Sequence, residues 1–362
     1  MKRVKTGIVG CGAISPAYLQ NLMGCFSSII EVTACSDLIP DRSHGRAGEF
    51  GVPRVCSTEE ILADPEIEIV VNLTNPWEHY AVSRDALLAG KNVFSEKPIT
   101  VEMEEAEDLL DIARRKGLLV AGASDIFLGA GLQECRRLLD GGAIGVPLLA
   151  SAFIALNYGS TPHRQRKGTG PVYDMGPYYL TALAVLAGPI RRVSGATSTP
   201  FQQKPWGANT PHAGEMFEVE TPMEAVATLE FDSPLLAVFA ASGEASEGYV
   251  PRLEFYGTNG TLQASDPNMY RRPVLIRGRE GREVELHSGF MEEGRGLGVA
   301  ELAWALRSGR QPRASGELMA HVLEVGHAIH RAADTGSRQL IHSAPARPEP
   351  FDLQAMFDAF HS

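Results

Sequence analysis

The sequence predicts an α/β protein with a doubly wound parallel sheet in its N-terminal part and an antiparallel or mixed sheet after it. Three observations predict this fold. The chain has 362 residues, which is too long for one compact core and suits two domains. Strands and helices alternate up to about residue 124, as they do in parallel α/β sheets. After residue 125, several β-rich stretches follow one another without helices between them.

The N-terminal elements are marked by apolar runs and by helix-end signals. Ser57-Thr58-Glu59-Glu60 is a capping box, because the serine hydroxyl and the second glutamate can satisfy each other's exposed amides. Asn75 is expected to cap a helix that has Pro76 at its first position and ends at Gly90. The predicted strands are 4–9, 30–36, 67–73, 93–95 and 118–121, and further helices are predicted at 16–23 and 100–116.

The second part contains longer β-rich segments between polar turns. Gly257-Thr258-Asn259-Gly260 predicts a hairpin turn. Residues 202–214 and 278–298 are predicted to be long loops or weakly structured edges. The predicted strands are 147–156, 190–197, 223–231, 235–242, 252–256 and 260–264, and the predicted helices are 132–139, 298–307 and 317–335. These patterns give three regions: 1–124, 125–342, and a Pro-rich linker with a tail helix at 343–362.

The charge and the cysteines exclude several classes of protein. The 44 acidic and 33 basic residues give a net charge of -11, which argues against nucleic acid or an anionic membrane as the main partner. A basic run, 163–167, is interpreted as a solvated loop or a substrate-facing edge. Five cysteines without C-x-x-C spacing predict neither a disulfide framework nor a zinc site, and the expected location is the cytoplasm. No signal peptide, membrane span or metal site is expected.

The first chemical motif is a glycine loop that follows the first predicted strand. Gly10 permits a tight turn, Gly12 lets backbone amides approach a pyrophosphate, and Ser15 stands where a third glycine is usual and can also donate to a phosphate. Asp37 ends the second strand, where a carboxylate accepts hydrogen bonds from a ribose diol. NAD is therefore the predicted cofactor, although Arg42 and the nearby Arg46 leave NADP open.

A second motif, Glu96-Lys97-Pro98, directly follows a predicted parallel strand. Polar groups at the carboxyl ends of such strands line the ligand crevice. Lys97 can hold a substrate hydroxyl and lower the pKa of a neighbouring acid, and Pro98 fixes the backbone that aims it.

The third motif places Tyr178 four residues after Asp174. If one helix contains both, they lie one turn apart on the same face. A carboxylate beside a phenol can hold and deprotonate a substrate hydroxyl. The alternative is that Tyr178 is a core residue of an amphipathic helix. His163 and His79 are rival bases, of which His79 is expected to be structural.

The chain resembles the Gfo/Idh/MocA family of sugar and inositol dehydrogenases, which includes glucose–fructose oxidoreductase. The resemblance covers nearly the whole chain, and the second and third motifs are more specific than the glycine loop. It rests on Gly10-x-Gly12, Asp37, Asn72-x-Thr74-x-Pro76-x-x-His79, Glu96-Lys97-Pro98 and Gly168-x-Gly170-x-x-x-Asp174-x-Gly176, in this order.

The resemblance implies a Rossmann domain, then an α/β domain with a large, mostly antiparallel open sheet that builds homodimers or homotetramers. It also implies NAD(P)-dependent oxidation or reduction at a secondary alcohol of a sugar, cyclitol or related polyol. Lys97 would polarise the substrate hydroxyl, Asp174 would bind substrate, and position 178 would be the acid/base. The cofactor-binding residues would be Gly10, Gly12, Ala13, Ile14, Ser15, Asp37, Arg42, Thr74, Asn75, Pro76, His79, Glu96 and Lys97; the substrate residues would be Lys97, His163, Asp174 and Tyr178.

This chain departs from the common pattern of the family at position 178. Most members have histidine there, and this chain has Tyr178, as some members similar to glucose–fructose oxidoreductase do. An ordinary phenol has a pKa of about 10, so it needs a nearby cation such as Lys97 to become a base. Two alternatives remain open: a non-catalytic NAD(P)-binding sensor of the same fold, and an NAD-dependent glycosidase.

Overall fold

The chain folds into two compact units, each made of segments that are distant in sequence. In this computed structural model, the described residues are 1–246, 252–264, 266–270, 273–278, 283–286 and 294–361. The first unit comprises Met1–Leu128, Glu293–Ala320 and Pro348–Ser362; the second comprises Gly129–Glu292 and His321–Arg347. None of the helices in these described segments is long and apolar enough to cross a membrane.

The first unit is built on a five-stranded sheet in which every neighbouring pair is parallel. The strand order is β2-β1-β3-β4-β5, as in doubly wound folds, and this confirms the predicted N-terminal architecture. The strands are β1 (Val4–Val9), β2 (Ile30–Ser36), β3 (Ile69–Asn72), β4 (Asn92–Ser95) and β5 (Val120–Gly122). Central strand residues such as Ile69, Val70 and Val71 are fully buried, as expected of a sheet covered on both faces.

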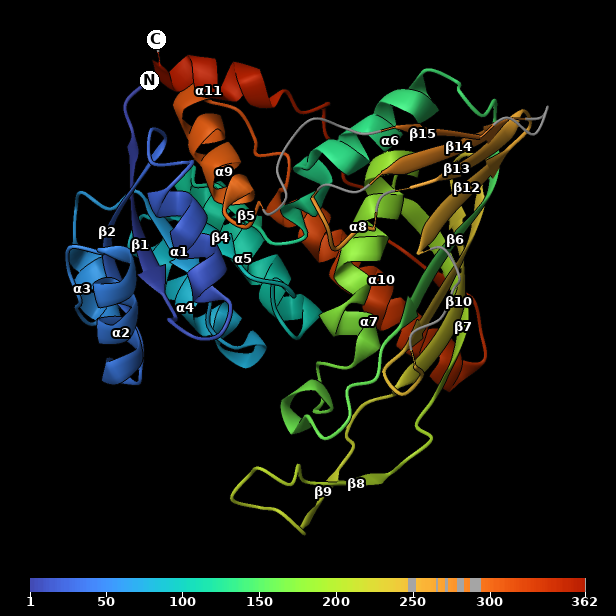
Figure 1. Cartoon of the computed structure of the whole chain (residues 1–362), viewed down its shortest axis with the longest axis horizontal. Helices are drawn as coiled ribbons and strands as arrows, with labels where there is room; N and C mark the ends of the chain where they lie inside the picture. The colour runs from blue at the N-terminus through green and yellow to red at the C-terminus, as the bar shows by residue number, and fades with distance from the viewer. Residues whose placement is uncertain (247–251, 265, 271–272, 279–282, 287–293, 362) are drawn as a thin grey trace. The chain divides into compact units, whose positions relative to one another are not determined.

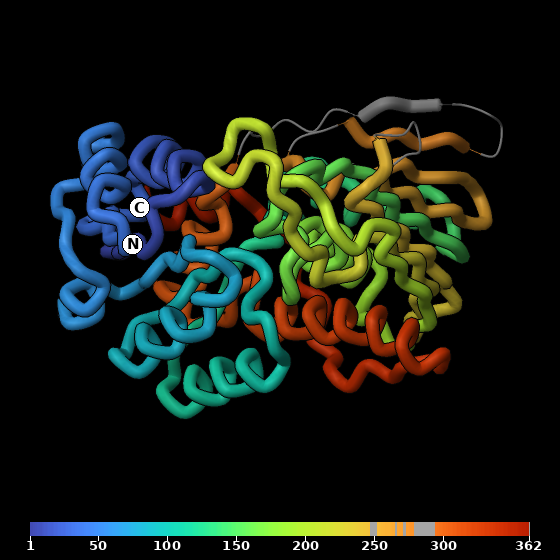
Figure 2. Tube along the Cα trace, turned by 90° about the horizontal axis from the view of Figure 1, so that it is seen from below, coloured from blue at the N-terminus to red at the C-terminus, as the bar shows by residue number. Residues whose placement is uncertain are grey.

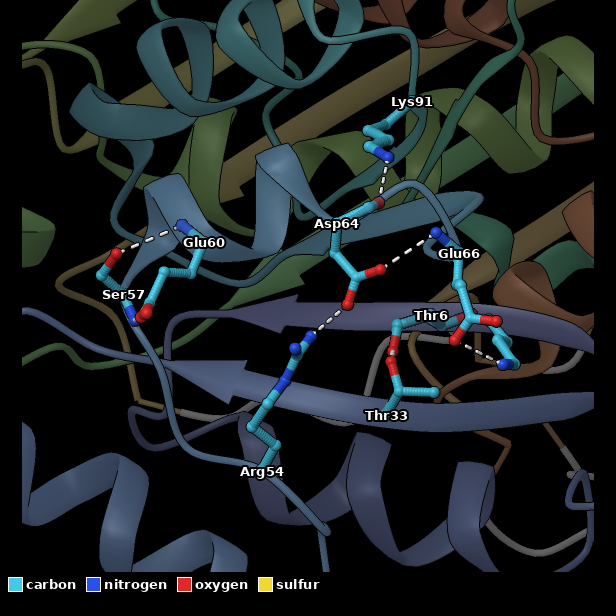
Figure 3. A network of polar contacts seen from close by, with 9 residues as sticks. Thr6, Thr33, Arg54, Ser57, Glu60, Asp64, Glu66 and Lys91 are labelled. Carbon is cyan, nitrogen blue, oxygen red and sulfur yellow. Dashed lines mark hydrogen bonds and ion pairs between the residues drawn. The ribbon is translucent and has the colours of Figure 1, made fainter.

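The helices of the first unit begin and end at sequence signals. The predicted capping box is confirmed, since the Ser57 amide donates to Glu60 at 2.8 Å and the Glu60 amide donates to the Ser57 hydroxyl at 3.2 Å (Figure 3). The helices are α1 (Ser15–Met23), α2 (Pro40–Phe50), α3 (Thr58–Ala63), η1 (Pro76–Glu78), α4 (His79–Leu88), α5 (Met103–Lys116), η2 (Asp125–Leu128), α9 (Leu297–Ser308) and α11 (Leu353–His361).

The connection from α3 to β3 is held by polar contacts around Asp64. Its carboxylate accepts from the Glu66 amide at 2.9 Å and pairs with Arg54. Lys91, which precedes β4, donates to the Asp64 carbonyl at 2.5 Å (Figure 3). These contacts fix the entry of β3, whose far end carries part of the candidate site.

Two features of the first unit differ from the sequence-based expectation. The Asn75 side chain makes no capping hydrogen bond, and the chain passes through η1 before α4 begins. Helix α2 was not predicted, because its residues Pro40–Phe50 are largely polar and bury little. The two ends of the chain lie side by side, with the Met1 amino group donating to the Ala359 carbonyl at 2.7 Å (Figure 2).

The second unit is built on a nine-stranded mixed sheet of order β15-β14-β13-β12-β6-β11-β10-β7-β16. Only the pair of β6 and β11 is parallel among these strands, so the predicted mixed sheet is confirmed. The strands are β6 (Pro147–Ala155), β7 (Ile190–Ser198), β10 (Glu224–Phe231), β11 (Leu236–Ser242), β12 (Leu253–Gly257), β13 (Gly260–Gln263), β14 (Val274–Gly278), β15 (Glu283–Leu286) and β16 (Gln339–Leu340). The predicted hairpin turn joins β12 and β13.

Helices cover one face of this sheet and leave the other face open (Figure 1). They are α6 (Ala130–Asp140), α8 (Gly176–Ala187) and α10 (Gly316–Thr335); the short η3 (Pro162–Arg164) and α7 (Pro171–Asp174) precede α8. Helix α8 buries every residue from Gly176 to Leu186, which explains its apolar sequence on all sides.

Two loops predicted in the second unit contain strands. The predicted loop 202–214 contains β8 (Gln203–Pro205), which pairs with β9 (Met216–Glu218) just after the loop. This hairpin projects from one end of the sheet (Figure 1). Its strands are too short to produce a visible alternation of polar and apolar residues. Within 278–298, β15 pairs with β14 and α9 begins at Leu297, while residues 279–282 and 287–293 lie outside the described part.

Candidate functional site

The glycine loop after β1 has the shape required for a dinucleotide. Gly10 has a φ of 98°, and a Cβ there would lie 2.7 Å from the Leu73 carbonyl group, so only glycine fits. A Cβ on Gly12 would meet nothing within 4 Å, which leaves room for a pyrophosphate in front of α1. The Ser15 hydroxyl donates to the Gly12 carbonyl at 2.8 Å and thereby closes the turn. Ala13 and Ile14 complete this loop, whose backbone amides would be the donors to a phosphate.

Asp37 stands at the end of β2, beside the glycine loop. Its Oδ2 accepts from the Cys11 amide at 2.7 Å, and its Oδ1 accepts from the Ile39 amide at 2.8 Å. Each carboxylate oxygen can accept further hydrogen bonds, so a ribose diol fits here as well. Arg42 is exposed on α2, whereas Arg46 pairs with Glu49 at 2.6 Å. The loop and Asp37 together suit NAD.

His79 joins the ends of two strands. Its Nδ1 lies 2.6 Å from the Pro98 carbonyl and its Nε2 lies 3.1 Å from the Thr74 carbonyl. Burial lowers the pKa of His79, so the ring is neutral near neutral pH. A neutral ring can donate to only one of these carbonyls, and the shorter contact favours Nδ1–H donating to the Pro98 carbonyl.

Asn72 organises the same strand end. Its Oδ1 accepts from the Thr74 hydroxyl at 2.6 Å, and its Nδ2 donates to the Ser83 hydroxyl at 3.0 Å. These bonds hold the turn that contains Thr74, Asn75 and Pro76 at the carboxyl end of β3, next to Gly10.

Glu96, Lys97 and Pro98 follow β4 at the same carboxyl edge. Glu96 is 8% exposed, accepts from the Tyr18 hydroxyl at 2.7 Å, and accepts from the Lys97 amide at 3.0 Å. The Lys97–Pro98 peptide is cis, and Lys97 is half-buried. Because β1 to β4 are parallel, their carboxyl ends gather the glycine loop, Asp37, Thr74 and Lys97 at one edge of the sheet.

The second unit contains a separate polar cluster around Asp174, which ends α7. The Arg164 Nε lies 3.6 Å from the Asp174 Oδ2. Tyr178 lies in α8 and is 6% exposed. The helix is interrupted at Met175, between α7 and α8, so the expectation that Asp174 and Tyr178 share one helix is wrong. Gly176-Pro177 explains the break, because proline favours the first turn of a new helix.

Tyr158 is the residue of this cluster that the sequence did not reveal. It follows β6, is 4% exposed, and lies with its ring centroid 5.2 Å below the Arg164 guanidinium. Burial and the negative charge of Asp174 hold the pKa of Tyr158 far above its ordinary value, and Tyr178 adds to this effect. Tyr158 therefore keeps its proton and can act as a donor but not as a base.

His163 lies next to this cluster, exposed on η3. Desolvation by the surrounding protein and the positive charge of Arg164 lower the pKa of His163, against the opposing effect of Asp174. The imidazole is therefore neutral near neutral pH. Among the described residues, no group of His, Cys, Asp or Glu is arranged to hold a metal ion.

Comparisons with known proteins agree with both units. Residues 4–123 match the family model described as "Oxidoreductase family, NAD-binding Rossmann fold", and residues 132–263 match the "GFO/IDH/MocA C-terminal domain". The uncharacterized oxidoreductase YrbE of Bacillus subtilis is 25% identical over 76% of this chain and 76% of its own length. The 1,5-anhydro-D-fructose reductase of Ensifer adhaerens is 25% identical over 91% of this chain and 96% of its own.

A solved structure extends the likeness over the whole fold. Levoglucosan dehydrogenase in complex with NADH and L-sorbose has a TM-score of 0.83 at 18% identity, covering 94% of this chain and 99% of that chain. The two matching domain models, the glycine loop and the strand-end residues lead to one conclusion. The chain belongs to the GFO/IDH/MocA family of oxidoreductases and binds NAD through its N-terminal unit.

Proposed function

We propose that the protein transfers a hydride between NAD and a secondary alcohol or carbonyl of a sugar, cyclitol or related polyol. The observation that carries the proposal is the position of Lys97, at the carboxyl end of β4 on the edge that also holds the glycine loop. The relatives support the substrate class, since one is a 1,5-anhydro-D-fructose reductase and one structure of similar fold contains NADH and L-sorbose.

In this proposal each side chain has a separate task. Bound nicotinamide supplies the carbon that accepts or returns the hydride. Lys97 holds the reacting hydroxyl through its ammonium group and favours the alkoxide form. Tyr178 takes up or releases the hydroxyl proton, in the position where most of the family has histidine. Asp174 accepts a hydrogen bond from a second substrate hydroxyl, and Tyr158 and Arg164 lie beside that carboxylate.

Asp37 supports NAD over NADP in the same proposal. A carboxylate accepts hydrogen bonds from the ribose diol and repels a 2′-phosphate. The exposed Arg42 is the residue that would have to reach a 2′-phosphate, and Arg46 is paired with Glu49.

The open face of the nine-stranded sheet supports a homodimer or homotetramer. Large apolar side chains alternate with buried ones along its central strands, and in the strand register Leu149 lies opposite both Leu236 and Tyr256. The exposed members of this set, here called the open-face residues, are Leu149, Phe153, Val226, Leu236, Val238 and Tyr256. Contiguous apolar surface of this kind marks an interaction site.

A cofactor-reduction screen tests the proposed function. Sugars, cyclitols, polyols and sugar acids are offered with NAD or NADP, and the formation of reduced cofactor is measured. At least one polyhydroxylated substrate is expected to reduce NAD, with NADP less effective. Release of product from a chromogenic glycoside without net cofactor reduction would instead indicate a glycosidase, and inactivity with every compound would favour a sensor.

A further inference from the structure

Arg164 forms a long ion pair with Asp174, and the other N–H groups of its guanidinium can still donate hydrogen bonds. Its Nε is 3.6 Å from the Asp174 Oδ2, and its side chain is 48% exposed. Within residues 1–246 and the other described segments, its guanidinium makes this ion pair and a contact over the Tyr158 ring, but no hydrogen bond. A guanidinium carries five N–H donors in a planar fork. The outer edge of the fork is therefore available to a ligand bound beside Asp174.

The backbone at Arg164 and Gln165 is held by hydrogen bonds, whereas the Arg164 side chain is about half exposed. The Gly170 amide, at the start of α7, donates to the Arg164 carbonyl at 2.9 Å. The neighbouring Gln165 is fully buried, its Nε2 donates to the Gly159 carbonyl at 2.8 Å, and its carbonyl accepts from the Glu220 amide at 2.8 Å. The guanidinium is thus presented from a preorganised loop, which reduces the entropy lost on binding.

The charges around Arg164 suit an anionic ligand with a single charge. Tyr158 stays neutral because its pKa is raised, and His163 stays neutral because its pKa is lowered. Asp174 and Glu220, whose carboxylate accepts from the Lys167 amide at 3.2 Å, offset two of the three positive charges of Arg164, Arg166 and Lys167, which leaves one positive charge on this loop. A carboxylate bonds a guanidinium through two parallel N–H···O bonds. A phosphate dianion would be repelled more strongly by Asp174.

From these contacts we propose that Arg164 binds a carboxylate of the substrate, so that the preferred substrates are sugar acids. The inference rests on the proposed function, in which Asp174 accepts a substrate hydroxyl. The substrate would then be held at two points within this unit: a hydroxyl on Asp174 and a carboxylate on the fork of Arg164. A neutral polyol would lack the second contact.

Matched pairs of acid and neutral substrates test the proposal. D-gluconate is compared with D-glucitol, D-galactonate with D-galactitol, and D-glucuronate with D-glucose, by kcat/KM with NAD. The wild-type protein is expected to prefer the acid in at least one pair. Arg164→Gln is expected to lower the acid-to-neutral ratio of kcat/KM by about 10- to 100-fold, since a bidentate charged hydrogen bond is lost. Arg164→Lys, which keeps the charge without the fork, should restore part of the ratio.

A control and a binding measurement separate this inference from the proposed function. Arg137→Gln removes an exposed arginine of the same unit, paired with Glu134 at 2.6 Å, and should leave the ratio unchanged. Thermal stabilisation by the sugar acids, measured without turnover, should be larger than that by the neutral partners and should be lost in Arg164→Gln.

Two results would overturn the inference while leaving an active dehydrogenase: neutral substrates that work as well as the acids, or an acid-to-neutral ratio that Arg164→Gln does not change. A preference for D-glucose 6-phosphate over all the carboxylates would also overturn it. Absence of reduced cofactor with every substrate would refute the proposed function, and the stabilisation measurement would still decide whether Arg164 binds the acids.

Discussion

Lys97 is the residue on which the proposed chemistry depends most. It is half-buried at the end of β4, and its amide is bound by the carboxylate of Glu96 at 3.0 Å. Lys97→Ala should lower kcat by about a thousandfold, the upper range for loss of a proton-handling group, because the substrate alkoxide loses its cation. Affinity for NADH, measured by fluorescence titration, should change little, since backbone amides hold the phosphates.

A second lysine provides the control for this substitution. Lys116 is exposed at the end of α5, where its Nζ donates to the Leu88 carbonyl at 2.9 Å. Lys116→Ala should keep full activity. A kcat near the wild-type value in Lys97→Ala would remove Lys97 from the mechanism.

The two tyrosines near Asp174 should respond differently to loss of the phenol. Tyr178→Phe removes the proposed proton carrier and should lower kcat about a hundredfold or more. Tyr158→Phe removes a protonated phenol that supports Asp174, so KM should rise about tenfold while kcat changes little. Steady-state kinetics on the same substrate measures both effects.

Tyr179 is a matched control for these variants. It is fully buried in α8, and its hydroxyl donates to Asp266 at 3.3 Å. Tyr179→Phe should leave both constants near the wild-type values. If Tyr158→Phe lowers kcat as strongly as Tyr178→Phe is expected to, Tyr158 is the proton carrier and the assignment of Tyr178 is wrong.

The residues predicted from the sequence and those missed differ in one physical respect. Gly10, Asp37 and Lys97 follow β1, β2 and β4 of one parallel sheet, so their convergence can be inferred from the alternation of strands and helices alone. Tyr158 is buried because its amide donates to the distant Gly243 carbonyl at 2.8 Å and its ring packs with Phe217, Val219 and Met223. No local pattern contains that information.

At the scale of elements, α10 is fixed by a buried histidine. The Ile190 amide donates to the His321 Nε2 at 3.1 Å, and the His321 Nδ1 lies 2.8 Å from the Ser343 hydroxyl, which donates to Glu324 at 2.5 Å. The ring is therefore neutral, with Nε2 as acceptor. These bonds attach α10 to the start of β7 and to the segment after β16.

Protonation of His321 would break this arrangement, which predicts acid sensitivity. Burial lowers the pKa of His321 from 6.5 to about 4. Below about pH 6.5 the unfolded chain takes up a proton that the folded chain does not accept until about pH 4, so stability is lost as the pH falls through this window. The loss approaches about 3 kcal/mol, and His330, whose pKa burial also lowers to about 4, acts in the same direction.

Thermal or urea unfolding in a series of buffers from about pH 7.5 to about pH 4 measures this loss of stability. His321→Gln can keep an acceptor for the Ile190 amide but cannot titrate. The variant should be less stable at neutral pH and should lose less stability on acidification. An equal slope in both proteins would show that His321 does not carry the acid sensitivity.

Sequence signals were reliable for elements with strong ends and weak for those without. The capping box of α3 and the buried β3 strand were predicted because local chemistry determines them. Helix α2 and the β8–β9 hairpin were missed, since α2 buries little apolar surface and each strand of the hairpin has three residues. Neither leaves a clear periodic pattern.

At the scale of the whole molecule, the open-face residues predict self-association. Leu236 is 53% exposed in a central strand of the sheet. Leu236→Glu should place a charge in the proposed interface and shift the protein to a smaller oligomer, measured by light scattering after gel filtration. Leu88→Glu, at a 45% exposed position on α4, should not change the mass. A wild-type monomer would contradict the proposed assembly.

The discontinuity of both compact units is also a whole-molecule property. Helix α9 joins the first unit, where the Gly298 amide donates to Asp125 at 2.8 Å. Hydrophobic periodicity predicts α9 as a helix but does not show which sheet it packs against. That choice depends on contacts over more than a hundred residues of chain.

The central claim is hydride transfer from a substrate carbon to NAD, and isotope transfer tests it most directly. The polyol or sugar acid that reduces NAD in the screen is prepared with deuterium on its carbinol carbons. NMR of the reduced cofactor should then show deuterium at C4 of the nicotinamide, appearing about a thousandfold more slowly in the Lys97→Ala variant. Formation of NADH without deuterium at C4 would contradict the account.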